Sequence, residues 1–184
     1  MSWNHSRLRL RFGGHARELV YDRGSMPHIH ERVDFTVEVF IVYKNKVLLR
    51  KHDKYGIWLS VGGHVELHED PNEAAVREVK EEIGLDIKLA DGLLPFHMDT
   101  EEYCELIPPK FMNRHRISPH HEHISMTYFA LAKTDKIKNE GGEESEECRW
   151  FTKEELQSKK FDIRDSIKVY ALAALSELGS TEKN

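Results

Sequence analysis

The feature that most constrains this chain is a run of carboxylates in residues 63–85, which read GHVELHEDPNEAAVREVKEEIGL. Glu78, Glu81 and Glu82 are spaced i, i+3 and i+4, so a helix would place all three on one face. Like charges at this spacing repel each other and destabilise a solvated helix. A divalent cation that prefers oxygen ligands would reverse that effect. The spacing alone leaves open a plain solvated acidic face, which is a common role of glutamate-rich helices.

The neighbouring residues predict where this helix begins and ends. Asp70 suits the N-cap, Pro71 suits the first helical position, and Glu73 can complete a capping box. Gly84 suits the C-terminal end. The glutamate face is separate from an apolar arc that is suited to packing on a sheet, formed by Ala75, Val76, Val79 and Ile83.

The rest of the chain predicts an α/β protein. Residues 33–43 are rich in β-branched and aromatic residues, and a turn at 44–46 leads into a second strand from Val47. Further strands are predicted at 86–90, 103–113, 122–133 and 149–151. A loop or hairpin tip is predicted at 113–121, a second capping box at Thr152 and Glu155, and an amphipathic helix at 162–178 that Gly179 ends.

Length and composition favour one soluble domain over residues 1–184, with residues 1–30 as an N-terminal extension or an added strand. The net charge of −5 argues against general nucleic-acid binding, which needs a basic face. The two cysteines, Cys104 and Cys148, are too few for a disulfide scaffold. The sequence has neither a secretory apolar region nor a membrane-spanning run. We therefore expect a cytoplasmic protein.

The segment from Gly63 to Leu85 resembles the signature of the Nudix hydrolases, the MutT-like family, at every defined position. Five residues separate Gly63 from Glu69, and seven separate Glu69 from Arg77, where REVKEEIGL begins. The resemblance implies a Nudix fold, which is an α/β/α sandwich around a central mixed sheet with a catalytic loop–helix–loop. One departure is Val61, where family loops often carry proline before the two glycines. We expect this change to affect loop stiffness rather than chemistry.

The resemblance also implies an activity and a cofactor. Family members hydrolyse the pyrophosphate bond of a nucleoside diphosphate linked to another group, with Mg²⁺ as the cofactor and Mn²⁺ as a possible substitute. Carried over by position, the metal ligands and catalytic residues would be Glu78, Glu81 and Glu82, with the Gly63 carbonyl as a further ligand. Glu69 and Arg77 would form a structural ion pair. The sequence lacks the P-loop pattern, and Mg²⁺ held by the carboxylates would supply the charge neutralisation that the phosphoryl oxygens need.

Three further residues are candidates for catalysis and substrate binding. Glu144, in the acidic loop before Trp150, is our choice of general base. The alternatives in the same loop are Glu143, Glu146 and Glu147, and the loop could also have no catalytic role. Arg50 is our choice for substrate phosphates, ahead of Lys51, Arg114 and Arg116, because its strand ends toward the glycine loop. Tyr103, eighteen residues after Leu85, resembles a tyrosine of the diadenosine-polyphosphate branch.

Histidines and aromatic residues offer less specific signals. His115, His120, His121 and His123 lie near Glu122, but they lack the usual spacing of a zinc site. We therefore predict that they are exposed or face the substrate, and His64 and His68 are candidate substrate contacts. Trp58, Tyr103 and Phe111 could stack on a base, although core packing is the expected role of at least two of them.

The leading hypothesis is thus a Mg²⁺-dependent pyrophosphohydrolase whose partner is a small nucleotide or other diphosphate, with no membrane partner. A homodimer is compatible with the sequence. The alternative from another class is a non-catalytic Nudix-fold protein that binds or senses a nucleotide. A third hypothesis is isomerase chemistry of the isopentenyl-diphosphate type, whose members have a degenerate signature. The complete set of glutamates in this chain favours the hydrolase.

Overall fold

A mixed seven-stranded sheet forms the centre of the computed structural model, which describes residues 32–52, 56–90, 92–93, 98–138 and 147–179. Along the sheet the strands follow the order β3 (Ile57–Leu59), β2 (Lys46–His52), β1 (Val33–Tyr43), β6 (His121–Ala132) and β4 (Ile87–Leu89). In addition, β5 (Phe111–Ser118) pairs with β6, and β7 (Cys148–Phe151) pairs with β2. Within the described residues, β1 and β6 form a parallel pair, and the other pairs of named strands are antiparallel.

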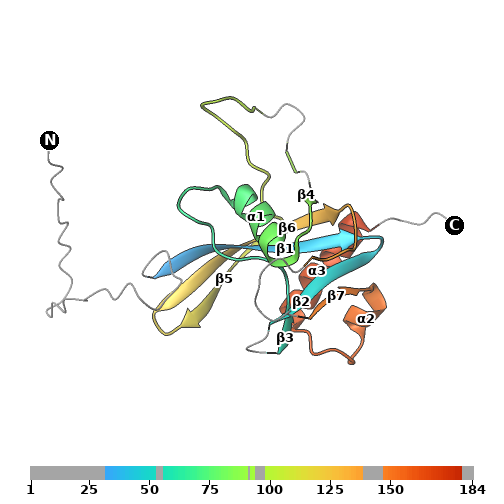
Figure 1. The fold of residues 1–184 in the computed structure, drawn as a ribbon. Coiled ribbons are helices and arrows are strands. Elements are labelled where there is room, and N and C mark those ends of the chain that lie inside the picture. The colour runs from blue at the N-terminus through green and yellow to red at the C-terminus, as the bar shows by residue number, and fades with distance from the viewer. Residues whose placement is uncertain (1–31, 53–55, 91, 94–97, 139–146, 180–184) are drawn as a thin grey trace, which may run out of the picture.

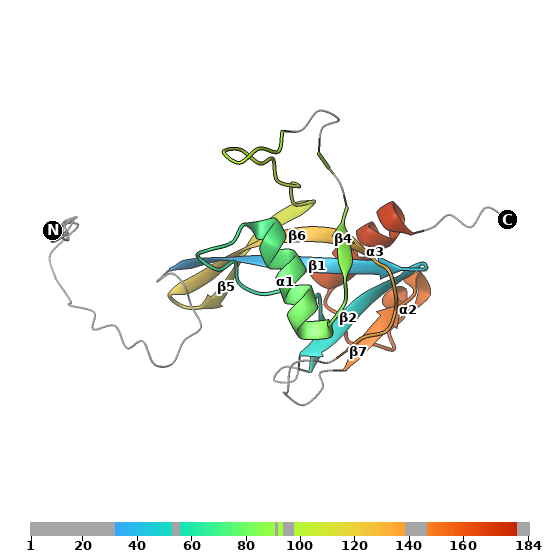
Figure 2. The same cartoon turned by 45° about the horizontal axis from the view of Figure 1, so that its top comes forward.

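Helices cover both faces of this sheet (Figures 1 and 2). Helix α1 (Pro71–Ile83) lies on one face, and α3 (Asp165–Leu178) with the short α2 (Lys153–Gln157) lies on the other. Alternate side chains of β1 serve the two faces, as a strand requires. Val37, Val39 and Ile41 belong to the core under α1, whereas Phe40 and Val42 belong to the core under α3. The α/β/α sandwich expected from the sequence is confirmed.

The elements that position the carboxylates match the predictions closely. Strand β1 has the predicted bounds, and Lys44 and Asn45 adopt positive φ of 43° and 58° in the tight turn that follows it. Helix α1 begins after Asp70, whose side chain accepts hydrogen bonds from the backbone of Asn72 and Glu73. Glu73 completes the capping box, as predicted.

The predictions were wrong for the segment before β6. Residues 103–110, predicted as part of a strand, run outside the named strands, and Asn72 at the start of α1 holds them through two hydrogen bonds with the backbone of Ile107. Of the residues predicted as a loop or hairpin tip at 113–121, residues 113–118 belong instead to β5. This strand forms an antiparallel hairpin with β6, and the predicted hairpin tip is confirmed at 119–120. Polar side chains obscured this strand in the sequence, because β5 is largely exposed to solvent.

The last helix begins at Asp165, three residues after the predicted start. Ile163 forms an isolated parallel bridge with Trp58 and is buried, so the chain is still extended there. Gly179 ends the helix, as predicted. Among the described residues, no helix is long and apolar enough to cross a membrane. The predicted extension at 1–30 lies outside the described residues.

Candidate active site

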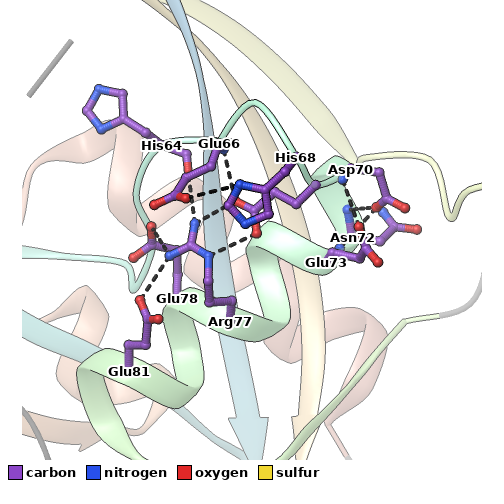
Figure 3. Close-up of polar contacts among 10 residues, drawn as sticks. His64, Glu66, His68, Asp70, Asn72, Glu73, Arg77, Glu78 and Glu81 are labelled. Atoms are coloured by element: carbon purple, nitrogen blue, oxygen red, sulfur yellow. Dashed lines mark hydrogen bonds and ion pairs between the residues drawn. The ribbon is translucent and has the colours of Figure 1, made fainter. Parts of the chain in front are cut away.

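Arg77 is the centre of the carboxylate cluster on α1 (Figure 3). Its guanidinium forms a bidentate pair with Glu69, with Nε 2.9 Å from Oε2 and Nη2 2.6 Å from Oε1. Nη2 also donates to the backbone carbonyl of His64 at 3.0 Å. Hydrogen bonding to Arg77 lowers the pKa of Glu69 below its ordinary value. The predicted ion pair is therefore confirmed, and it ties the loop before α1 to the helix.

Two of the three signature glutamates meet at one nitrogen of the same arginine. Nη1 of Arg77 donates to Glu78 Oε1 and to Glu81 Oε2, each at 2.9 Å. Burial raises the pKa of Glu78, and the hydrogen bond from Arg77 partly opposes this effect. Glu81 is more exposed, with 61% of its side-chain surface accessible. The guanidinium thus offsets the like-charge repulsion that the sequence implies.

The third glutamate, Glu82, is held by a different cation. Its Oε1 lies 2.7 Å from Nη2 of Arg50, and its Oε2 accepts a hydrogen bond from the backbone N–H of Gly62 at 3.1 Å. Arg50 lies on β2, directly opposite Leu59 of β3. Arg50 thus contacts the same carboxylate as the Gly62 N–H, and its predicted role toward the substrate phosphates stays a prediction.

The two glycines before α1 each occupy a position where a side chain would collide. Gly62 has φ of 151°, and a Cβ there would lie 2.0 Å from the backbone oxygen of Val37. A Cβ at Gly63 would lie 2.3 Å from Glu78 Oε1. The Gly63 carbonyl accepts a hydrogen bond from the Val37 N–H at 2.8 Å and, like any carbonyl, has a second lone pair. The loop therefore lies directly against the carboxylates.

Other predicted site residues have different surroundings. Tyr103 lies in the loop between β4 and β5, half exposed, where its backbone pairs with Thr100 rather than with a strand as predicted. Glu144 lies outside the described residues. Trp58 is buried against Phe151 with ring centroids 4.9 Å apart, so it packs in the core. Phe111 stacks on Tyr170 at 5.1 Å and is partly exposed.

A second polar cluster, which the sequence reasoning missed, lies at the start of β1. Asp34 is fully buried, and its Oδ2 lies 3.4 Å from His64 Nε2 and 3.3 Å from His121 Nε2. The ring of His123 lies 4.9 Å from that of His64 and 5.3 Å from that of His121. Burial, with a smaller contribution from the neighbouring imidazoles, lowers the pKa of His123 to about 4.

The histidines at 115–123 were predicted to be exposed or to face the substrate. His115 and His120 are exposed, His123 is partly buried and His121 is buried, so exposure is wrong for His121, and a position facing the substrate stays a prediction. A signal was present in the sequence, because His121 and His123 are two residues apart and share one face of a strand. The contribution of Asp34 and His64 depends on strand pairing, which a single sequence does not give.

Comparisons with known proteins agree with this fold and site. A family model described as the NUDIX domain matches residues 34–172. A crystal structure of a hydrolase of the NUDIX family from Clostridium perfringens is 35% identical, covers 79% of this chain and 97% of its own, and superposes with a TM-score of 0.68. The chain therefore belongs to the NUDIX family, as the signature predicted. Membership of this family supports a hydrolase.

More distant structures show the same fold. A MutT protein from Methanosarcina mazei Go1 is 17% identical with a TM-score of 0.58, and the match covers 82% of this chain and 98% of that one. A MutT NUDIX hydrolase from Burkholderia pseudomallei is 21% identical with a TM-score of 0.54, covering 80% and 99%. At these identities the likeness concerns the sheet and its covering helices alone.

Proposed function

We propose that this protein hydrolyses a pyrophosphate bond in a nucleoside diphosphate linked to another group, with Mg²⁺ held by the carboxylates of α1. The substrate would be a small nucleotide or a dinucleotide polyphosphate. The observation that carries the proposal is the meeting of Glu78 and Glu81 at one nitrogen of Arg77, beside Gly63. Carboxylate oxygens brought this close together, beside a glycine that leaves room for them, offer the oxygen ligands that a hard dication prefers.

The available donors fit Mg²⁺ by their chemistry. Glu78, Glu81, Glu82 and the Gly63 carbonyl would hold the ion, and all of them offer oxygen, which Mg²⁺ prefers. The absence of a side chain at Gly63 leaves the space in which Glu78 lies. When bound, the ion would neutralise charge on the phosphoryl oxygens and lower the pKa of a bound water. Mn²⁺ has similar ligand preferences and is expected to substitute for Mg²⁺.

The protein's own residues would prepare the site. Arg77 holds Glu78 and Glu81 in place and is itself anchored by Glu69. Arg50, which lies against Glu82, would contribute positive charge to the substrate phosphates. We keep Glu144 as the proposed general base and Tyr103 as a proposed substrate contact. Both roles rest on the position of these residues in the sequence.

The proposal is tested by measuring the release of phosphate and nucleotide products from a panel of nucleoside and dinucleoside polyphosphates with Mg²⁺. We expect wild-type turnover of at least one member of the panel. Glu82→Gln should lower kcat at least tenfold, which corresponds to about 1.4 kcal/mol of transition-state stabilisation. Glu154→Gln is the matched control, because this exposed glutamate lies on α2 outside the carboxylate cluster, and it should leave kcat unchanged.

A parallel screen of melting temperature with the same panel separates the two leading functions. A nucleotide that is turned over should also stabilise the folded state by mass action. Stabilisation by a nucleotide without any turnover, in the presence of Mg²⁺ or Mn²⁺, would instead identify a binding or sensor protein and would overturn the hydrolase proposal. Equal kcat values for wild type and Glu82→Gln would overturn the assigned ligand set.

A further inference from the structure

The cluster around Asp34 brings metal-binding groups from separate parts of the chain to one point. Ligand atoms of Asp34, His121 and His123 all lie within 4.8 Å of one another. Asp34 and His121 are buried, and His123 is partly buried. Carboxylate oxygens and imidazole nitrogens are common ligands of zinc, and here they come from both strands of the parallel pair.

Strand pairing explains why these particular side chains meet. Asp34 of β1 and His123 of β6 are direct partners in the parallel ladder, and His121 precedes His123 by two residues and so shares its face. His64 joins from the loop before α1, because it forms an antiparallel bridge with Thr36 of β1. In Figures 1 and 2 the start of β1 lies beside the tip of the β5–β6 hairpin. Three segments therefore converge on one position.

The distances within the cluster resemble the edges of a metal site. Asp34 Oδ2 lies 3.3 Å from His121 Nε2 and 3.4 Å from His64 Nε2. A direct N–H···O hydrogen bond has its optimum at about 2.9–3.0 Å. In a tetrahedral zinc site with bonds of about 2.0–2.1 Å, two neighbouring ligand atoms lie about 3.3 Å apart. The two separations from Asp34 are longer than the hydrogen-bond optimum and close to this value, and the ligand atom of His123 lies within 4.8 Å of those of Asp34 and His121.

We propose that Asp34, His121 and His123, with His64 as the fourth ligand, bind one Zn²⁺ ion at a site separate from the α1 carboxylates. Three imidazole nitrogens and one carboxylate oxygen suit zinc, whereas the all-oxygen set on α1 suits Mg²⁺. His64 approaches Asp34 to 3.4 Å but lies outside the group of three mutually close ligand residues, so it would have to move inward to complete a tetrahedron as the fourth ligand. The ion would join the start of β1, the start of β6 and the loop before α1.

His64 also connects this site to the glycine loop before α1. The residue beside His64 is Gly63, which lies against Glu78. Zinc at this site would therefore fix the position of the glycine loop, and its contribution would be mainly structural.

Zinc titration of the full chain, without an added histidine tag and after treatment with a chelator, tests the proposal. We expect one equivalent of Zn²⁺ to bind in competition with a chromophoric chelator and to raise the melting temperature. His123→Gln should weaken the affinity at least tenfold. His120→Gln is the matched control, because this exposed neighbour lies outside the cluster and should leave the affinity unchanged. Co²⁺ in place of Zn²⁺ should give the strong visible absorption of a four-coordinate ion.

Two further variants keep the outcome interpretable. Glu82→Gln should retain zinc binding, since it alters only the α1 carboxylates, and a loss of zinc in this variant would place the ion there instead. His64→Gln provides a second test if His123→Gln fails to give the native circular dichroism spectrum, and it should also weaken zinc binding.

Equal zinc affinities for wild type and the cluster variants, or no binding in the micromolar range, would overturn the proposal. Tight binding that survives both substitutions would place the ion elsewhere, for example on histidines before residue 32.

Discussion

At the scale of single residues, arginines determine how the signature carboxylates are arranged. Arg77 belongs to the signature itself and gathers three glutamates, Glu69, Glu78 and Glu81. Arg50 comes from β2 and holds Glu82. A lysine could not reproduce the arrangement at position 77, because its ammonium is a point charge without the planar fork that binds Glu69 in bidentate fashion. The shape of the guanidinium is therefore as important as its charge.

The two glycines of the loop should respond differently to substitution by alanine. At Gly62 the new Cβ would meet the backbone of Val37, and its φ of 151° disfavours any side chain. We expect Gly62→Ala to lower the free energy of unfolding by at least about 2 kcal/mol, since overpacking alone costs about 1–3 kcal/mol. At Gly63 the colliding atoms are those of the Glu78 carboxylate, which a change of side-chain rotamer can move, so Gly63→Ala should fold almost normally and lose activity.

Urea denaturation and turnover assays on both variants measure these effects. Gly92→Ala serves as the control, because its Cβ would make only an ordinary contact with Pro108 at 3.4 Å. We expect this control to change stability by less than about 0.5 kcal/mol. A Gly63→Ala variant with normal turnover would show that the position of Glu78 has little influence on the chemistry.

The residue scale also shows what a sequence can and cannot predict about the sites. Glu69 and Arg77 were paired correctly, because they belong to one local signature with fixed spacing. Asp34 was missed because nothing in the local sequence marks it. Its neighbours His121 and His64 are far away in sequence, and only the β1–β6 register and the bridge at Thr36 bring them to it.

At the scale of elements, local signals succeeded where residues close in sequence determine the structure. The bounds of α1 follow from Asp70, Pro71 and Gly84, whose effects act within one helical turn. Strand β5 could not be predicted in this way. Its exposed polar residues are not typical of a strand, and it forms because β6 offers a partner along its length.

Removing the N-cap of α1 should destabilise the element that carries the glutamates. Asp70 accepts hydrogen bonds from the N–H groups of Asn72 and Glu73 at 2.7 and 3.0 Å. We expect Asp70→Ala to lower the free energy of unfolding by about 1 kcal/mol, as loss of a cap typically does. Thermal or urea denaturation measures this change. Asp70→Asn keeps a capping oxygen and should lie close to wild type, whereas equal losses for both variants would mean that the charge matters rather than the cap.

At the scale of the whole molecule, two clusters of polar side chains with different ligand atoms lie at different positions on the sheet. On one face, α1 holds oxygen donors around Arg77. At the start of β1 and β6, imidazoles surround a buried aspartate. Both places share the loop at 62–64, since Gly63 contacts Glu78 and the adjacent His64 contacts Asp34. Changes at the Asp34 cluster are therefore expected to reach the carboxylates through this loop.

Two glutamates with opposite pKa shifts should give the molecule a characteristic dependence of stability on pH. Glu69 has a lowered pKa through its hydrogen bonds with Arg77, so its stabilising contribution is complete above its unfolded pKa of about 4.5 and is lost as pH falls through the folded value. Glu38 has a raised pKa because of burial, despite hydrogen bonds from Thr127 and Ser125. Its contribution is most favourable below about 4.5 and is lost as pH rises through the folded value.

Neutral substitutions should therefore have opposite effects at pH 7. Glu69→Gln should lower the free energy of unfolding at pH 7, and the difference from wild type should shrink in acid as Glu69 itself becomes protonated. Glu38→Gln should raise it at pH 7, because the buried charge is removed while an oxygen acceptor for Thr127 is kept. This gain should also vanish below about pH 4.5, where wild-type Glu38 is neutral.

Urea denaturation from pH 3.5 to 8 measures both differences. A Glu38→Gln variant less stable than wild type at pH 7 would show that the charge of Glu38 is compensated by a cation in the folded protein.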